Sequence, residues 1–191
     1  SDGTYLTPVS VNTPNGLFRD YFKKPIGITS FVQPPQISAF GPDHFIFTSV
    51  SENTSIKVQV IDYIETDFGA NYEPRILFDS DITVSDGNLT TPDKFERPVS
   101  VLLTGDGTNF IFVVDQAKDS FYQFTVTGLE GVKPPPGAAT SKYQMASFGG
   151  SGEGLSQFNQ PSAIAYKNNI VWVCDTGNER ILRFKLTTDF Q

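Results

Sequence analysis

Three polar residues in the C-terminal part of the sequence have the types and the spacing of a catalytic or ligand-binding trio. Asp175, Asn178 and Arg180 fall within one short segment, in which the carboxylate could transfer a proton and the guanidinium could hold an anion. A structural role explains the same residues, because a carboxylate at a strand end can accept N–H groups of the following turn and pair with an arginine. Gly177 would supply the positive φ that such a turn requires. We therefore expect structural roles for Asp175, Gly177 and Arg180, and for Asp115, which ends an earlier apolar run.

The other residues that could do chemistry stand alone. The chain contains one cysteine, Cys174, and one histidine, His44. No cationic residue stands beside Cys174 to activate its thiol, so we expect it to behave as a small buried apolar side chain. His44 ends the segment Gly41-Pro42-Asp43-His44, which is a turn by composition, and we expect it on the surface. The sequence therefore predicts no catalytic residue, no metal site and no cofactor within this chain.

Charge and hydropathy argue against two classes of protein. The 191-residue chain has 14 basic and 21 acidic side chains and a net charge of −7, and its basic residues do not cluster. A nucleic-acid-binding surface needs such a cluster, so we expect no nucleic-acid partner. The longest apolar runs, such as 110–114 and 170–174, are far shorter than the roughly 18–20 residues of a membrane-spanning helix, and no transmembrane segment is expected.

The composition also suggests a location. An acidic balance, little lysine and many Asn, Thr, Ser and Gly residues suit an exported protein. The segment Ser1-Asp2-Gly3 resembles the trimmed end of such a protein. We therefore expect an extracellular, periplasmic or cell-surface protein.

The elements that must position these residues are short β-strands. Runs rich in Val, Ile, Phe, Tyr and Thr alternate with clusters of Gly, Pro, Asn and Asp, and no segment has a convincing helical period. Asp106-Gly107, between two such runs, is typical of a tight hairpin turn. The run 170–174 is apolar throughout, which predicts a strand covered on both faces, with Trp172 packed between sheets. The expected strands are 36–40, 45–50, 55–63, 99–104, 110–115, 120–126, 162–166, 170–175 and 180–186, with outer strands at 75–78 and 143–148.

A motif of the form Phe-x-x-Pro divides the chain into repeats. It is found at Phe31–Pro34, Phe95–Pro98 and Phe158–Pro161, about 63 residues apart. Each of these copies is followed by a short apolar strand, a turn, a strongly apolar strand and a further strand. A repeat of about four antiparallel strands at this period is typical of one β-propeller blade.

The third repeat resembles the NHL repeat of six-bladed β-propellers. The resemblance over 148–184 rests on a glycine-rich segment, on Phe-x-x-Pro, on an apolar strand that ends in Asp-Thr-Gly-Asn, and on Arg-Ile-x-x-Phe. Residues 95–126 match more loosely, because Gln116-Ala117-Lys118 replaces Thr-Gly-Asn and Ser120 stands at the position of Arg180. Residues 31–61 match in spacing alone. The resemblance implies an all-β fold of about three four-stranded antiparallel blades that belong to a six-bladed propeller.

The repeat starts predict how the chain is divided. Residues 31–94 would form one blade, 95–157 a second and 158–191 an incomplete third. Residues 1–30 would supply an outer strand, at 17–22 or 26–31, that closes a ring. Three repeats cannot close a propeller, which needs at least four blades, and six blades at this period would take about 380 residues. We therefore expect the blade faces to be covered by the remainder of the same propeller or by another chain.

Function must be predicted from surface residues, because propellers serve many functions. The resemblance implies that linkers between blades share one face with the turns between second and third strands. On that face we expect polar residues that bind a partner: Arg97, Lys118, Asp119, Gln160, Asn178 and Glu179. The favoured prediction is a non-enzymatic binding or scaffold module with a protein or glycan partner. The alternative is a lyase or lactonase of the propeller type, whose metal site is completed by residues outside this chain.

Overall fold

The structure is a computed structural model, and its fold consists of short β-strands joined by turns. The structure describes residues 8–32, 43–75, 87–106, 108–134, 136–143 and 147–186. Within these residues the secondary structure is β apart from one short 3-10 turn, η2 (Thr176–Asn178), and no helix is long and apolar enough to span a membrane. The all-β prediction is confirmed.

The first part of the chain forms a hairpin and a four-stranded sheet. Strands β1 (Val11–Thr13) and β2 (Gly16–Phe18) pair with each other. The sheet that follows, blade 1, has the antiparallel order β3-β4-β5-β6. Its strands are β3 (Pro25–Phe31), β4 (His44–Ser49), β5 (Val58–Thr66) and β6 (Gly69–Arg75).

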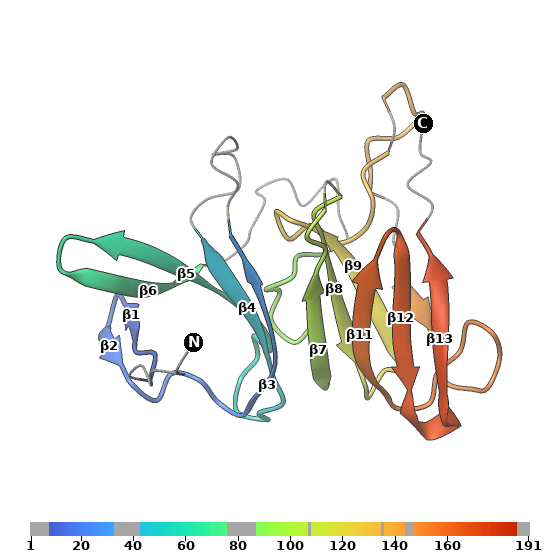
Figure 1. The fold of residues 1–191 in the computed structure, drawn as a ribbon, viewed down its shortest axis with the longest axis horizontal. Helices are drawn as coiled ribbons and strands as arrows, with labels where there is room; N and C mark the ends of the chain where they lie inside the picture. The colour runs from blue at the N-terminus through green and yellow to red at the C-terminus, as the bar shows by residue number, and fades with distance from the viewer. Residues whose placement is uncertain are drawn as a thin grey trace.

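Two further antiparallel sheets follow in chain order (Figure 1). Blade 2 contains β7 (Pro98–Leu103), β8 (Phe110–Asp115), β9 (Ser120–Thr125) and β10 (Ser147–Gly149). Blade 3 contains three described strands, β11 (Pro161–Lys167), β12 (Ile170–Asp175) and β13 (Arg180–Lys185). All of these lie close to strands expected from the sequence, because strand-length apolar runs between turn residues favour this structure.

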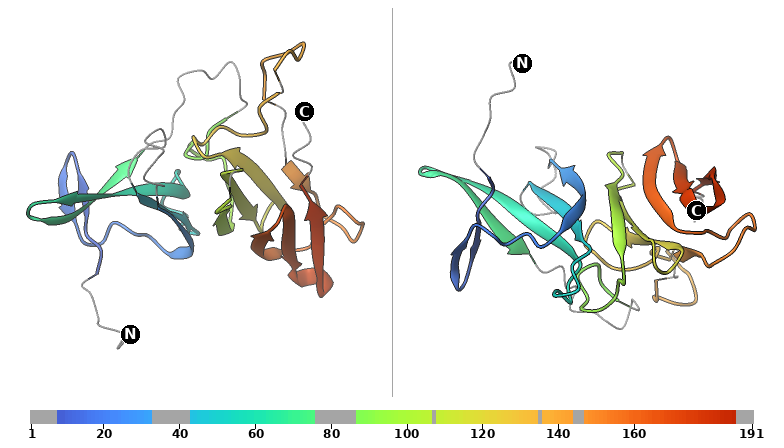
Figure 2. Two further views of the ribbon diagram at one scale, coloured as in Figure 1. Left: turned by 45° about the horizontal axis from the view of Figure 1, so that its top comes forward. Right: turned by 90° about the horizontal axis from the view of Figure 1, so that it is seen from below.

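The blades pack face to face, with their first strands β3, β7 and β11 next to one another, as Figures 1 and 2 show. The approach is close at Gly27, where a Cβ atom would lie 3.0 Å from the carbonyl oxygen of Val99. Blades 1 and 2 share an apolar core that includes Ile46, Val60 and Val113. Blades 2 and 3 share a second core that includes Phe112 and Val173, so the second strands of these two blades face each other.

The start of blade 1 differs from the one predicted from the sequence. Its first strand begins at Pro25 and pairs with β4, so 26–31 is the inner edge of this blade and not a ring-closing outer strand. The motif that precedes it is Phe22-Lys23-Lys24-Pro25, a copy of Phe-x-x-Pro earlier than the one used to place the boundary at residue 31. The expected strand at 36–40 lies outside the described residues.

His44 is also placed differently from the prediction. It is the first residue of β4 and is 4% exposed, rather than lying in a surface turn. Its ring stacks on Phe31, and its Nδ1 accepts a hydrogen bond of 2.8 Å from Nη2 of Arg75, which also pairs with Asp62. Sequence reasoning missed this because Arg75 comes from β6, the far strand of the same sheet.

Candidate functional site

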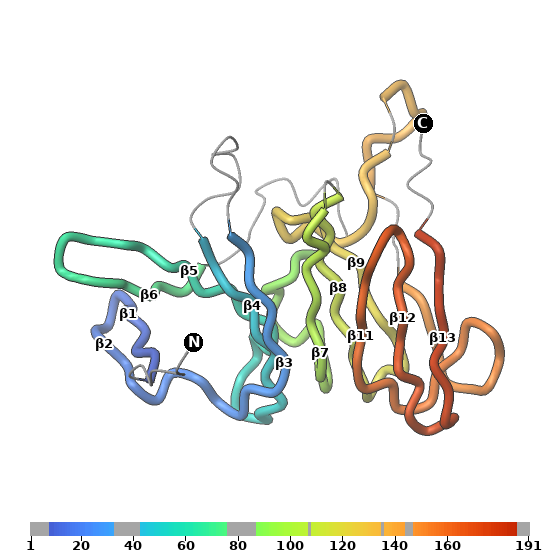
Figure 3. The backbone as a smooth tube through the Cα atoms, in the orientation of Figure 1, coloured from blue at the N-terminus to red at the C-terminus, as the bar shows by residue number. Residues whose placement is uncertain are grey.

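The candidate site is the edge of the blades at which the first strands begin and the second strands end, here called the loop edge. The register sets Pro25 opposite Ser49, Pro98 opposite Asp115, and Pro161 opposite Asp175. The loops before β3, β7 and β11 therefore lie beside the turns that follow β4, β8 and β12. This edge is the lower one in Figure 3, where the turn η2 lies. The six residues predicted to bind a partner all belong to these loops and turns.

Asp175 is the buried acceptor of the edge in blade 3. It is fully buried, and its Oδ1 accepts the backbone N–H of Asn159 at 2.7 Å. Its Oδ2 accepts bonds from Nδ2 of Asn178 at 2.9 Å and from Nε of Arg180 at 2.7 Å. Burial is the largest single effect on its pKa and raises it, but the combined donors from Asn159, Asn178 and Arg180 hold the pKa below its ordinary value. The carboxylate thus joins the end of β12 to the loop before β11.

Arg180 connects this carboxylate to the glycine-rich linker. Its Nη1 donates to the carbonyl of Glu153 at 2.7 Å. Its Nη2 donates to the carbonyls of Gly154 at 2.8 Å and Gln157 at 3.0 Å. A planar guanidinium suits this arrangement because its N–H groups fan outward in fixed directions. The guanidinium of Arg180 therefore holds the glycine-rich linker in place, rather than binding a ligand.

Asp115 occupies the same place in blade 2 with different partners. It is fully buried, and its oxygens accept backbone N–H groups of Glu96 at 2.7 Å, Arg97 at 3.0 Å and Ala117 at 3.2 Å. Ala117 belongs to the turn after β8, which is the kind of contact expected from the sequence. For Asp175 that expectation was wrong in detail, because its one backbone donor lies in the loop before β11 rather than in the following turn.

Gly177 is needed for a reason other than the predicted one. The residue of this turn with a left-handed backbone is Glu179, with φ 53°, and Gly177 is not among the positive-φ residues. At Gly177 a Cβ atom would lie 2.7 Å from the carbonyl oxygen of Asn159, to which the Gly177 N–H donates. A side chain is excluded by this close approach and not by backbone conformation.

Two of the predicted partner-binding residues join blade 2 to blade 3. Oδ1 of Asp119 accepts the backbone N–H of Gln160 at 2.7 Å, and Oδ2 accepts the hydroxyl of Ser151. Asp119 and Gln160 both have left-handed backbones, with φ of 47° and 50°. The Asp119 carboxylate is therefore already occupied by the neighbouring blade.

The remaining predicted residues differ in the exposure of their side chains and in the hydrogen bonds that these side chains already make. Nδ2 of Asn178 donates to the carbonyl of Gly152 and to Asp175. Nζ of Lys118 donates to the carbonyl of Lys94, and Nε of Arg97 donates to Gln116. Arg97, Lys118 and Glu179 are exposed side chains. Their binding role stays a prediction.

Sequence reasoning missed the residues of this edge that come from blade 1. Lys23 and Lys24 form the loop before β3, and both are exposed. Lys57 reaches from blade 1 to the carbonyl of Glu96 in blade 2. The sequence feature that could have revealed them is the motif Phe22-Lys23-Lys24-Pro25, which has the same spacing as Phe95–Pro98 and Phe158–Pro161.

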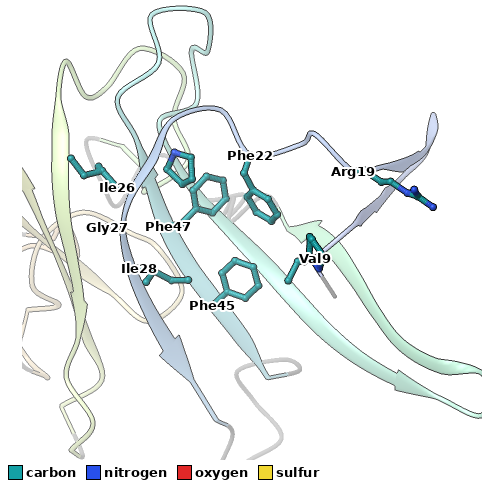
Figure 4. A pocket seen from close by; sticks show the side chains of 10 residues that line it. Val9, Arg19, Phe22, Ile26, Gly27, Ile28, Phe45 and Phe47 are labelled. Atoms are coloured by element: carbon teal, nitrogen blue, oxygen red, sulfur yellow. The ribbon is translucent and has the colours of Figure 1, made fainter. Parts of the chain in front are cut away.

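A second feature is an apolar cleft on the side of blade 1 that faces away from blade 2. Its volume is about 450 Å³. Figure 4 shows Phe22, Phe45 and Phe47 gathered around it, with Ile28 and Val9 at its sides. No prediction anticipated this cleft, because it forms between the N-terminal segment and blade 1, whose start was misplaced.

Residues 158–184 match the family model of the NHL repeat. NHL repeats form β-propellers, and the match covers Phe158, η2 and most of β13. The predicted resemblance of the third repeat to this family is therefore confirmed. No curated protein matched the chain. The export prediction stays a prediction.

Proposed function

We propose that this chain is a non-enzymatic β-propeller module that binds a protein partner through its loop edge. One observation carries the proposal: the buried polar groups of this edge bond to one another, while exposed charges of both signs surround them. Asp115 and Asp175 are fully buried and bonded within the protein. The exposed charged residues are Lys23, Lys24, Glu96, Arg97, Lys118, Glu153 and Glu179.

The chemistry of this surface supports a protein partner. Exposed side chains of both signs lie along the edge, basic at blade 1, mixed at blade 2 and acidic at blade 3, which favours a partner with a complementary pattern of both signs. A nucleic acid would need a surface of one sign, and the chain as a whole carries a net charge of −7. The NHL repeat of blade 3 supports an interaction module of the β-propeller type.

Site-specific photocrosslinking in cells of the source organism tests the proposal. A photoreactive phenylalanine analogue at Ala117, an exposed residue of the loop edge, should give an adduct of defined mass. The matched control places the same group at Thr127, an exposed residue that follows β9 at the opposite edge, and should give none. The partner identified in this way should bind the purified chain, and Arg97→Ala with Lys118→Ala should slow association. Equal adducts from both positions, or none from Ala117, would contradict a loop-edge partner site.

A further inference from the structure

The contact between blades 2 and 3 shows how one blade of this chain receives the next. Three residues of blade 2 are at most 1% exposed and pack against blade 3: Phe112, Val114 and Phe121. The residues of blade 3 that receive them are Phe158, Val171 and Val173, which are also fully buried. The contact thus has a giving face, on β8 and β9, and a receiving face, on β12 and the loop before β11.

Blade 3 has a giving face of its own. Its register repeats that of blade 2, since Cys174 pairs with Ile181 as Val114 pairs with Phe121. Trp172 then stands at the position of Phe112. Ile181 is 68% exposed, and Trp172 and Cys174 are half-buried, so within the described chain nothing seals this face. The prediction that Trp172 packs between sheets is not met within the described chain.

Blade 1 has a receiving face of its own. Because Pro25 faces Ser49 as Pro161 faces Asp175, Phe45 and Phe47 stand at the positions of Val171 and Val173. Phe22 stands at the position of Phe158. These three phenylalanines line the cleft of about 450 Å³, and Ile28 at its margin is 69% exposed (Figure 4). The N-terminal segment covers part of this face, because Val11 packs against Phe47, and the cleft lies on the remaining part, where the giving face of a preceding blade would dock.

The polar contacts at the two ends also match. In the contact between blades 2 and 3, Asp119 accepts the backbone N–H of Gln160. Glu179 stands at the position of Asp119 and has a similar φ, 53° against 47°. Lys24 stands at the position of Gln160, with φ 43° against 50°. Among the described residues, neither the Glu179 carboxylate nor the Lys24 N–H has a partner.

Charge complementarity points the same way. Glu179 shares a polar hollow of about 370 Å³ with Glu153 and Arg180, whose guanidinium is already bonded to Asp175 and to the linker. The loop before β3 carries two cations, Lys23 and Lys24, and of these Lys23 pairs with the exposed Asp20. One end of the row of blades thus carries an acidic turn and the other end a basic loop, so the two ends have opposite charge.

We propose that the giving face of blade 3 docks on the receiving face of blade 1 in a second copy of this chain. Trp172 and Ile181 of one copy fill the cleft around Phe22 and Phe47 of the other. The described chain carries both halves of the contact, so each of two copies can receive the giving face of the other, and the two join as one ring of six sheets. Closed head-to-tail contacts leave no apolar face in water, whereas exposed faces of this kind are unusual on a monomer. The proposal does not rest on the partner site at the loop edge.

Sedimentation velocity on the full chain tests the contact. We expect a species of twice the 21.0 kDa chain mass at micromolar concentrations. Ile181→Glu and Ile28→Glu each place a charge on an exposed residue of one face, and each should raise the dissociation constant at least tenfold without altering the circular dichroism spectrum. Phe68→Glu is the matched control, because Phe68 is fully exposed at the β5–β6 hairpin and away from both faces.

A mixing experiment separates this contact from other modes of self-association. The Ile28→Glu chain keeps the giving face, and the Ile181→Glu chain keeps the receiving face. Mixed together, they should form a two-chain species that neither forms alone, held by one contact instead of two. The proposal is overturned by a wild-type monomer at 100 μM, by open filaments, or by dimers that survive Ile181→Glu. The crosslinking test at Ala117 does not depend on any of these outcomes.

Discussion

Blades 2 and 3 end their second strands with the same residue and surround it with different donors. Asp115 accepts three backbone N–H groups, and no cationic side chain among the described residues donates to it. Asp175 accepts one backbone N–H, and an amide and a guanidinium take the remaining positions. Ser120 stands where Arg180 stands, and its short side chain does not extend to the carboxylate or to a linker as Arg180 does.

The shared requirement is therefore an acceptor at the end of the second strand, and not the arginine. In both blades the carboxylate ties the strand end to the loop that precedes the first strand. The same connection in blade 1 is made by Ser49, whose hydroxyl donates to the carbonyl of Lys23. A residue type that varies while the connection stays is typical of a structural role, and it leaves the exposed side chains of the loop edge to bind partners.

The largest effect is expected at Asp115. Asp115→Ala leaves three backbone N–H groups without their acceptor in a buried site, and should lower the free energy of unfolding by about 2–4 kcal/mol. Urea unfolding measures the change. Asp115→Asn keeps one acceptor oxygen and should lose less. Equal losses in the two variants would show that the N–H groups do not depend on the carboxylate.

Gly177 tests the close approach that distinguishes the turn of blade 3. Gly177→Ala sets a Cβ atom against the Asn159 carbonyl and should cost about 1–3 kcal/mol. Gly105→Ala is the control, because a Cβ atom there meets nothing within 4 Å. Thermal melting compares the two. A loss at Gly105 as large as that at Gly177 would contradict the steric explanation.

Arg180 tests the dependence of blade 3 on its guanidinium. Arg180→Ala removes the donor to Asp175 and the bonds to three carbonyls of the linker, and should cost about 1–2 kcal/mol because the side chain is 28% exposed and partly screened. Ser120→Ala, at the same position of blade 2, should change stability by less than about 0.5 kcal/mol. Chemical denaturation of both variants decides this, and similar losses at the two positions would remove the contrast between the blades.

The smallest effect is a pH dependence of Asp175. Its folded pKa is lowered, so its charge stabilises the fold above the unfolded value of about 3.9 and this stabilisation is lost as the pH falls through the folded pKa. The difference in unfolding free energy between wild type and Asp175→Asn should be constant between pH 5 and 7 and shrink below about pH 4. A difference that grows on acidification would contradict the direction of the pKa shift.

The strands could be predicted from the sequence, because a local pattern determines them. The contacts of the site could not be predicted, because they join residues that lie far apart in the sequence. The apolar runs of β8 and β12 predicted both strands, because uniform apolar character suits a buried strand. The start of blade 1 was missed because a second copy of the motif, Phe31–Pro34, stands at the 63-residue period of the later repeats. The copy that opens the blade, Phe22–Pro25, falls outside that period because the connection between Phe31 and His44 is longer than those of the other blades. The bond from Gln160 to Asp119 joins residues far apart in sequence, and no local pattern reveals it.

Asp175→Asn tests most directly whether the buried carboxylates of the loop edge serve the fold while its exposed side chains serve binding. The variant is made in the chain that carries the crosslinker at Ala117, so that unfolding and adduct formation are measured on one protein. We expect the free energy of unfolding to fall by about 1–3 kcal/mol while the folded protein still forms the partner adduct. Unchanged stability with loss of the adduct would show that Asp175 belongs to the binding site and would contradict the structural role assigned to it.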